Sequence, residues 1–237
     1  MAFTSVEYAL LYGYFAKSIL TSGNSNSFDI LKSCTRRYGV ERGRRMLDRA
    51  RAAGDGSDFD SFIAYADWSP SHYSDFSAEV LEQFPAYSIE VRACGLYDVW
   101  CKCGLEEYCQ TYCDVFETAL AEGFNPDLDL KLPRAMGRQE PFCVFVYNGL
   151  SFTLSTLKRI NQMQEKLQRS AIRSWEQHSA HLYVAFSQEL LRIMGQEEAS
   201  SLVKKTLVEF GSACSKENVQ ILLTRAKNAP YVVGAPQ

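Results

Sequence analysis

The chain has little that points to nucleic acid or membrane. It carries a net charge of −3 over 237 residues and only three histidines. A charge balance of this kind does not favour nucleic acid, which binds clustered positive charge. No apolar run reaches the roughly 18–20 residues that a membrane helix needs. The N-terminal stretch contains Glu7 and lacks the basic start of a signal peptide, so it predicts an amphipathic helix. We therefore expect a cytoplasmic protein.

Cysteines, by contrast, are plentiful. There are eight, and five of them lie within residues 92–113, RACGLYDVWCKCGLEEYCQTYC. In a reducing compartment we expect core residues, reactive thiols or ligands in place of disulfides. The spacing of Cys101, Cys103, Cys109 and Cys113 matches neither the paired ligands of structural zinc nor a recognised iron–sulfur run. We expect no metal and no other cofactor.

Hydrophobic periodicity predicts helices at both ends of the chain and short strands between them. Helices are predicted over residues 5–20, 28–53, 61–67 and 105–122, and over most of 150–228. Gly39 and Gly43 are expected to bend or split the second helix, and Gly123 to end the fourth. Strands are predicted at 87–94, 128–132 and 142–147, with a short helix over 95–103 and irregular structure over 68–76. The pattern indicates an α+β fold, mostly helical, with a small antiparallel sheet of three to four strands in mid-chain.

The domain organisation follows from length and from an internal likeness. A chain of 237 residues suits one large domain or two small ones. We expect a single α+β domain, with a core in 1–150 and a helical part in 151–237. The helical part echoes the N-terminal helices, because LYVAFSQELL (182–191) resembles LYGYFAKSIL (11–20). Duplication and convergence of ordinary amphipathic helices both explain the likeness.

Two cysteines are candidates for a site. Cys94 lies where a predicted strand gives way to a glycine-containing turn, which can expose a thiol at the mouth of a pocket. A nucleophilic thiol must ionise, and Arg92 is a nearby cation that would lower its pKa. Cys113 shares a helix face with Cys109 and is either core or pocket lining. Ordinary burial is the alternative for each, since cysteine is among the most buried residue types.

Charged and aromatic residues supply further candidates. Asp114 or Glu117 could act as a general base for water if it lay in a dry pocket that raised its pKa; otherwise each is part of a solvated helix face. Arg42 or Arg45, within RRYGVERGRR (36–45), could bind a carboxylate through its guanidinium group. The remaining candidates are side chains that could line a pocket or titrate there, each with a structural alternative: Tyr97, Trp100, His72 and His178.

Several stretches resemble one family in their order and spacing. The resemblance is to the L-2-amino-thiazoline-4-carboxylic acid hydrolase family and covers about residues 8–147. It is carried by YGVERGRRMLDRARAAG (38–54), CGLYDVW (94–100), YCDVFETALAEGFNPDLDL (112–130), Gly137 and Cys143-Val-Phe. The resemblance implies an enzyme that opens a cyclic thiazoline at its amidine-like carbon to give an N-carbamoyl cysteine. It also implies a small-molecule substrate that carries one carboxylate.

One position departs from the family pattern. The family usually carries an acid shortly after its Tyr-Cys pair, and Phe116 stands there in this chain. Asp114 or Glu117 could replace that acid, although they project in different directions from a helix.

Two hypotheses for the function therefore remain. One is a hydrolase in which water or Cys94 adds to the ring carbon, with preorganised donors stabilising the charge. The other is a non-catalytic binding or sensing domain. The sequence leaves open whether the protein forms a homodimer.

Overall fold

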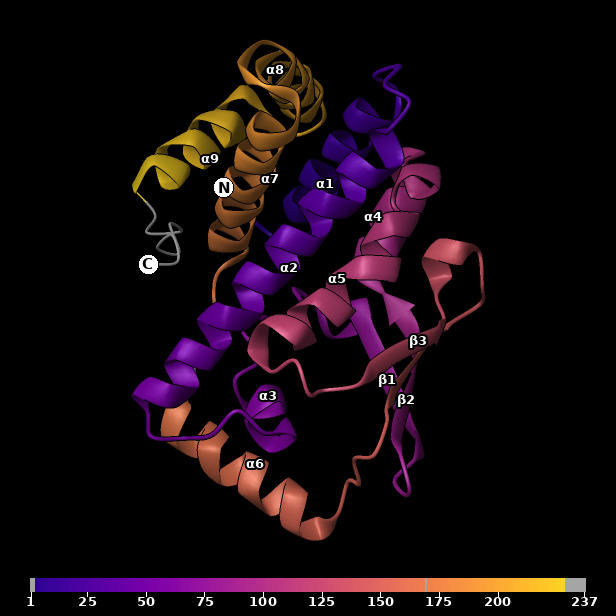
Figure 1. Cartoon of the computed structure of the whole chain (residues 1–237), viewed down its shortest axis with the longest axis vertical. Helices are drawn as coiled ribbons and strands as arrows, with labels where there is room; N and C mark the ends of the chain where they lie inside the picture. Colours follow the sequence, from indigo (N-terminus) through magenta and orange to yellow (C-terminus); the bar gives the residue numbers. More distant parts are fainter. Residues whose placement is uncertain (1–2, 169, 229–237) are drawn as a thin grey trace. The chain divides into compact units, whose positions relative to one another are not determined.

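The computed structural model describes residues 3–168 and 170–228. Within them the chain forms nine α-helices and a four-stranded antiparallel sheet in mid-chain, which confirms the predicted fold class (Figure 1). The helices are α1 Ser5–Leu20, α2 Ser27–Ala52, α3 Phe59–Ala64, α4 Gly95–Cys103, α5 Gln110–Phe124, α6 Leu154–Leu167, α7 Trp175–Met194, α8 Gln196–Ala213 and α9 Lys216–Asn228. The strands are β1 Phe76–Glu82, β2 Tyr87–Cys94, β3 Leu130–Arg134 and β4 Cys143–Tyr147.

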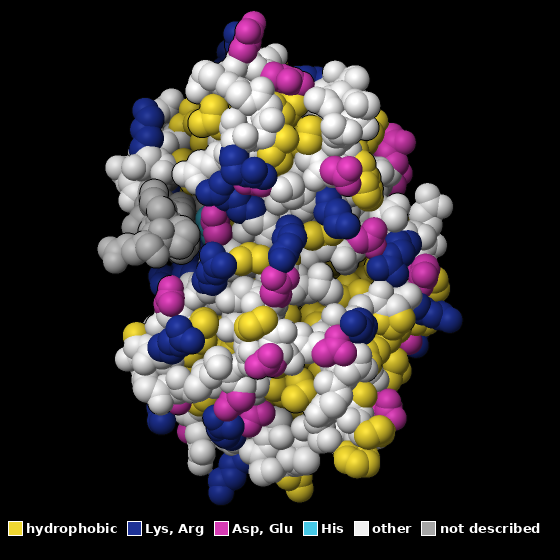
Figure 2. All heavy atoms as spheres, in the orientation of Figure 1, with side chains coloured by type: hydrophobic (Ala, Val, Ile, Leu, Met, Phe, Trp, Pro, Cys, Tyr) yellow, Lys and Arg dark blue, Asp and Glu magenta, His cyan; other side chains and the backbone are white. Residues whose placement is uncertain are grey.

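The elements gather into two compact units. Unit 1 comprises the described residues of Met1–Tyr38, Leu96–Thr111 and Ser174–Gln237, and unit 2 comprises Gly39–Gly95 and Tyr112–Arg173. Unit 1 is helical, whereas unit 2 holds the whole sheet. The expected single domain stays a prediction. On the face drawn in Figure 2, positive and negative side chains are interspersed, in keeping with the small net charge.

Unit 1 is built around an aromatic core. Tyr12 lies on the buried face of α1, where its ring is 5.8 Å from Trp100 and 5.7 Å from Phe186 between centroids. The Trp100 indole donates a hydrogen bond of 2.8 Å to the Ala9 carbonyl. Trp100 therefore buries a large apolar surface and still satisfies its one donor.

Close helix packing in unit 2 explains three glycines. A Cβ on Gly43 would lie 2.1 Å from the Leu120 carbonyl oxygen, and one on Gly123 would lie 2.3 Å from that of Val40. The glycines thus let α2 and α5 approach backbone to backbone. α2 continues through both Gly39 and Gly43, and α5 continues past Gly123. The predicted split of the second helix is therefore wrong, because its glycines serve tertiary packing, whereas α5 ends at Phe124, one residue beyond the predicted stop.

The sheet has the strand order β1-β2-β4-β3. β2 and β4 form its centre, and their register pairs Val91 with Cys143 and Ile89 with Phe145. β1 is an edge strand that begins within the stretch predicted to be irregular. All seven of its residues are exposed, so it lacks the alternation of buried and exposed positions that marks a half-buried strand.

Candidate active site

A cavity of about 150 Å³ lies inside unit 2, between α5, part of α2, the end of α3 and the sheet. Its walls are mostly apolar and aromatic and are formed by Met46, Phe62, Ile63, Ala66, Trp68, Phe76, Ile89, Val91, Leu120, Phe145 and Tyr147. Two carboxylates, Asp67 and Glu117, complete the lining among the residues that the structure describes. An apolar cavity with a few convergent polar groups is the usual form of a small-molecule site.

Strand and helix geometry places these side chains. Ile89 and Val91 lie on one face of β2 and line the cavity, while Glu90 between them does not. Their partners in β4 bring Phe145 onto the same sheet face. On α5, Glu117 faces the sheet. Side chains on a helix and on a strand therefore converge on one space.

Glu117 is a titratable group whose pKa this environment shifts strongly. It is half-buried, and desolvation raises its pKa to about 7, although the positive charge of Arg42 acts in the opposite direction. No described residue forms a hydrogen bond or ion pair with its carboxylate. A carboxyl group that exchanges its proton near neutral pH in an apolar cavity has the properties of a general base.

Tyr147 lies beside Glu117 in the cavity. Burial raises the pKa of its phenol well above the ordinary value, and the charge of Glu117 adds to this effect. The ring packs edge-to-face against Phe59, with 5.0 Å between centroids. Tyr147 is therefore a fixed donor that keeps its proton. Sequence reasoning did not single it out, although the alternation along β4 would have placed it on the face of Phe145.

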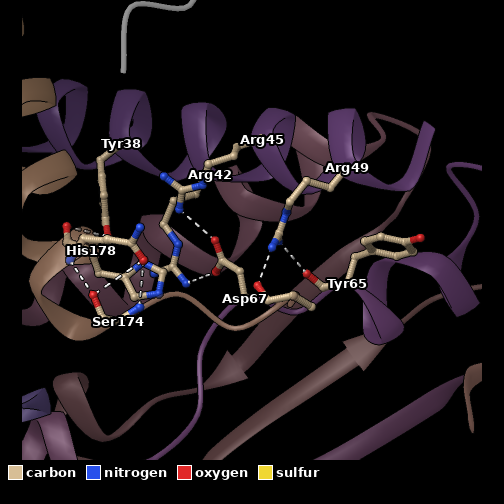
Figure 3. Close-up of polar contacts among 10 residues, drawn as sticks. Tyr38, Arg42, Arg45, Arg49, Tyr65, Asp67, Ser174 and His178 are labelled. Atoms are coloured by element: carbon tan, nitrogen blue, oxygen red, sulfur yellow. Dashed lines mark hydrogen bonds and ion pairs between the residues drawn. The ribbon is translucent and has the colours of Figure 1, made fainter. Parts of the chain in front are cut away.

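Arg42 and Arg45 converge on Asp67 (Figure 3). Arg42 Nη2 lies 2.5 Å from Asp67 Oδ1, and Arg45 Nη2 lies 2.7 Å from Oδ2. Asp67 has no exposed side-chain surface. The Arg42 guanidinium also lies 5.2 Å from the centre of the Phe116 ring. Two positive charges thus share one buried carboxylate at the cavity wall. No local sequence pattern indicated Asp67.

The structure brings three thiols together beside Glu117. Cys94 ends β2, Cys143 begins β4, and Cys113 lies on α5. Burial, followed by the nearby Cys94 and Cys143, raises the pKa of the Cys113 thiol far above its ordinary value. Cys113 therefore keeps its proton at neutral pH and is a poor nucleophile. Cys94 is half-buried, and its proposed reactivity stays a prediction.

The structure distinguishes between the two acids that could replace the one missing at Phe116. Asp114 accepts a hydrogen bond of 2.6 Å from Arg138 Nε, and both side chains are partly exposed. Glu117 faces the cavity. Of the two acids, only Glu117 lines this space among the residues described.

The other candidates are not among the residues that line the cavity. His72 is exposed, and its backbone N–H donates to Asp75 Oδ2 over 2.9 Å. Tyr97, Trp100 and His178 belong to unit 1. Trp100 is a core residue there, and His178 is buried, with its carbonyl accepting a hydrogen bond of 3.4 Å from the Tyr38 hydroxyl (Figure 3). Binding roles for these four residues stay predictions.

None of the described helices is both long enough and apolar enough to cross a membrane. Across residues 3–168 and 170–228, no group of three or more His, Cys, Asp and Glu side chains is arranged to hold a metal ion.

Comparison with known proteins identifies the family. Neither the curated proteins nor the solved structures gave a match. A family model described as L-2-amino-thiazoline-4-carboxylic acid hydrolase matches residues 4–147, which is more than half of the chain and includes every residue of the cavity lining. Membership implies hydrolysis of the L-2-amino-thiazoline-4-carboxylate ring, which is the work of a hydrolase. The chain belongs to the L-2-amino-thiazoline-4-carboxylic acid hydrolase family.

Proposed function

We propose that the cavity of unit 2 is the site of ring opening and that Glu117 is its general base. One observation carries the proposal: a carboxyl that forms no hydrogen bond or ion pair with any described residue, and whose pKa is raised to about 7, lines an apolar cavity. At neutral pH a large fraction of such a group is ionised and can accept a proton from water. The aromatic walls limit the amount of bulk water that competes with the substrate.

The reaction begins with addition of water to the amidine-like ring carbon. As the water oxygen bonds to this carbon, one water proton moves to Glu117 and the π electrons of the C=N bond move to the ring nitrogen. Glu117 then passes that proton to the nitrogen. Collapse of the adduct forms the new carbonyl, breaks the carbon–sulfur bond and leaves its electron pair on sulfur. The hydroxyl proton reaches the sulfur through Glu117, and the product is an N-carbamoyl cysteine.

Tyr147 supplies the donor for this sequence. Its phenol stays protonated because burial and the charge of Glu117 both raise its pKa. It shares the cavity lining with Glu117, so it can donate a hydrogen bond to the ring nitrogen, which gains negative charge as water adds. A fixed donor in a dry site stabilises developing charge more effectively than water does.

The buried arginines support an anionic substrate. Arg42 and Arg45 place two positive charges against the carboxylate of Asp67 at the cavity wall. The effect of Arg42 on the pKa of Glu117 indicates that this field extends to the base. We infer that the arginines favour the substrate carboxylate through this field while they remain bound to Asp67.

The thiols are not the nucleophile in this reaction. Because Cys113 is held as a neutral thiol, we propose water as the nucleophile. A Cys113→Ser variant should therefore retain activity. All eight cysteines are free, which supports the expected cytoplasmic location.

A non-catalytic binding domain is the second candidate, and Phe116 favours it. Its ring is buried and stacks on Tyr112, with 4.6 Å between centroids, so the usual acid position offers no proton acceptor.

The deciding experiment incubates the purified chain with L-2-amino-thiazoline-4-carboxylate and measures release of the product thiol. We expect turnover, with a loss of about 10²-fold or more in kcat for Glu117→Gln. Glu122→Gln, an exposed change on the same helix, should leave the rate unaltered. Binding without turnover by the wild type would support the second candidate.

A further inference from the structure

Two further arginines of unit 2, Arg49 and Arg173, lie close to each other and are not among the residues that line the cavity. Arg49 belongs to α2, one helical turn beyond Arg45, and Arg173 lies in the chain that follows α6. Desolvation lowers the pKa of Arg49 to about 10; the charge of Asp67 opposes this effect, and the charge of Arg173 adds to it. Two guanidinium groups of unit 2 are therefore near enough to repel each other.

Backbone contacts hold these two arginines side by side. The Arg49 guanidinium donates to the Ala171 carbonyl through Nη1, and to the Tyr65 carbonyl through Nη2 over 3.1 Å (Figure 3). The backbone N–H of Arg173 donates to the Asp67 carbonyl over 2.7 Å. The segment after α3 is thereby joined to the segment after α6, and Arg49 contacts both segments.

Neither guanidinium forms an ion pair with a carboxylate of the described residues. Both contacts of Arg49 are with neutral carbonyls, and the Arg173 side chain has no hydrogen bond or ion pair with any residue that the structure describes. In both residues Nε is buried and has no hydrogen-bond partner in that part of the chain. The nearby carboxylate of Asp67 is bound by Arg42 and Arg45 instead. Because a partly desolvated charge is costly without an opposite charge, the pair is suited to bind an anion.

We propose that Arg49 and Arg173 bind a phosphate group, either as free phosphate or as part of a small phosphate ester. Guanidinium groups recognise phosphate oxygens through paired N–H···O bonds. A guanidinium has more N–H donors than the two that Arg49 uses, so Arg49 keeps its carbonyl contacts when the anion binds. Two positive charges match the charge of about −1.5 to −2 that a phosphate group carries at neutral pH, whereas a carboxylate balances only one of them. This site is separate from the cavity proposed for ring opening.

Isothermal titration calorimetry of the full chain with inorganic phosphate tests the proposal. We expect saturable binding of a single phosphate per chain. Arg173→Gln should weaken this binding by at least about tenfold, because a charge-assisted contact is lost. Arg51→Gln, an exposed change on α2, is the matched control and should bind phosphate as the wild type does. A wild type without saturable binding, or an Arg173→Gln variant that binds phosphate equally well, would overturn the proposal.

Thermal unfolding shows whether the variant has lost the site alone. Without phosphate, Arg173→Gln should unfold at the wild-type temperature, since no described residue contacts its side chain through a hydrogen bond or ion pair. Added phosphate should raise the unfolding temperature of the wild type and of Arg51→Gln, because a ligand of the folded state stabilises it. An equal rise in Arg173→Gln would show that phosphate binds elsewhere and would contradict the assignment.

Two further ligands test the charge of the anion and its source. Acetate carries one negative charge and should bind at least about tenfold more weakly than phosphate; equal binding would refute the match between two arginines and a dianion. Glycerol 3-phosphate distinguishes the two sources of a phosphate group. Tighter binding than that of inorganic phosphate assigns the site to a phosphate ester, and weaker binding assigns it to free phosphate. These measurements need no turnover, so their outcome is independent of the ring-opening proposal.

Discussion

Arg42 Nη2 lies 2.5 Å from Asp67 Oδ1, and both side chains are almost completely buried. The pair joins α2 to the chain that follows α3. Arg45 binds the second oxygen of the same carboxylate from one helical turn further on. Arg42 and Arg45 thus have a structural role in α2, and the charge of Arg42 also lowers the pKa of Glu117 in the cavity.

Removal of the shared carboxylate should destabilise the protein strongly. Asp67→Asn leaves Arg42 and Arg45 without the negative charge that offsets their burial, and we expect a loss of about 3–5 kcal/mol in the free energy of unfolding. Urea denaturation measures it. Asp48→Asn, an exposed change on α2, is the control and should alter stability by less than about 0.5 kcal/mol. Equal stabilities of the two variants would show that the buried pair contributes little.

The contact between α2 and α5 should tolerate no side chain at Gly43. The added Cβ of Gly43→Ala would lie 2.1 Å from the Leu120 carbonyl oxygen, so the two helices must separate. We expect a loss of about 3 kcal/mol in the free energy of unfolding. Gly56→Ala is the matched control, because the nearest atom there lies 3.4 Å away. Thermal unfolding of both variants should show a large shift for Gly43→Ala alone.

The raised pKa of Glu117 should make stability fall with rising pH. The folded state binds this proton more tightly than the unfolded state, in which a glutamate has a pKa of about 4.3. The stabilising contribution is complete below that value and is lost as pH rises to about 7, the pKa in the folded protein. After allowance for the partial exposure of Glu117, it amounts to about 2 kcal/mol.

Comparison of two variants isolates this contribution. Glu117→Gln should lose the decline in stability between pH 4.3 and 7, and it should be the more stable protein above pH 7, because no charge is then buried. Glu122→Gln should follow the wild-type curve. Parallel curves for wild type and Glu117→Gln would mean that the carboxyl at 117 titrates normally.

The rate at which each cysteine is alkylated should depend on its exposure and on the pKa of its thiol. Burial raises the pKa of Cys34 far above its usual range and that of Cys214 to about 12, so both thiols should react slowly. Cys101 and Cys103 are exposed and should react first. We expect half-buried Cys94 to react faster than Cys34 and Cys214, as measured by mass spectrometry after timed alkylation. If Cys94 reacts no faster than those two, the case for it as a nucleophile fails.

Local sequence signals predicted the elements in which polar and apolar residues recur with a regular period. β2 was found because Ile89 and Val91 alternate with polar residues, and α1 because its apolar residues recur at helical spacing. β1 was missed because all of its residues are exposed. Gly43 was misread as a local break because its role depends on a helix that is distant in sequence.

The residues of the site also divide into those that the sequence indicated and those whose contacts form only in the folded chain. Glu117 and Arg42 were named from the sequence because an acid and a guanidinium group in this region suit the chemistry of the family. The sequence could not show that Arg42 binds Asp67, since the two residues meet only in the folded chain. Tyr147 enters the cavity through the pairing of β4 with β2, which is set by register. A single sequence does not show which residues that are distant along the chain pair in the fold.

The pH dependence of kcat/KM tests the role of Glu117 most directly. A general base must be ionised to act, so kcat/KM for ring opening should rise with pH and level off above a pKa of about 7. The residual activity of Glu117→Gln should lack this rise, whereas Glu122→Gln should keep it. A rise centred near pH 4.5, or one that persists in Glu117→Gln, would contradict the assignment of Glu117 as the base.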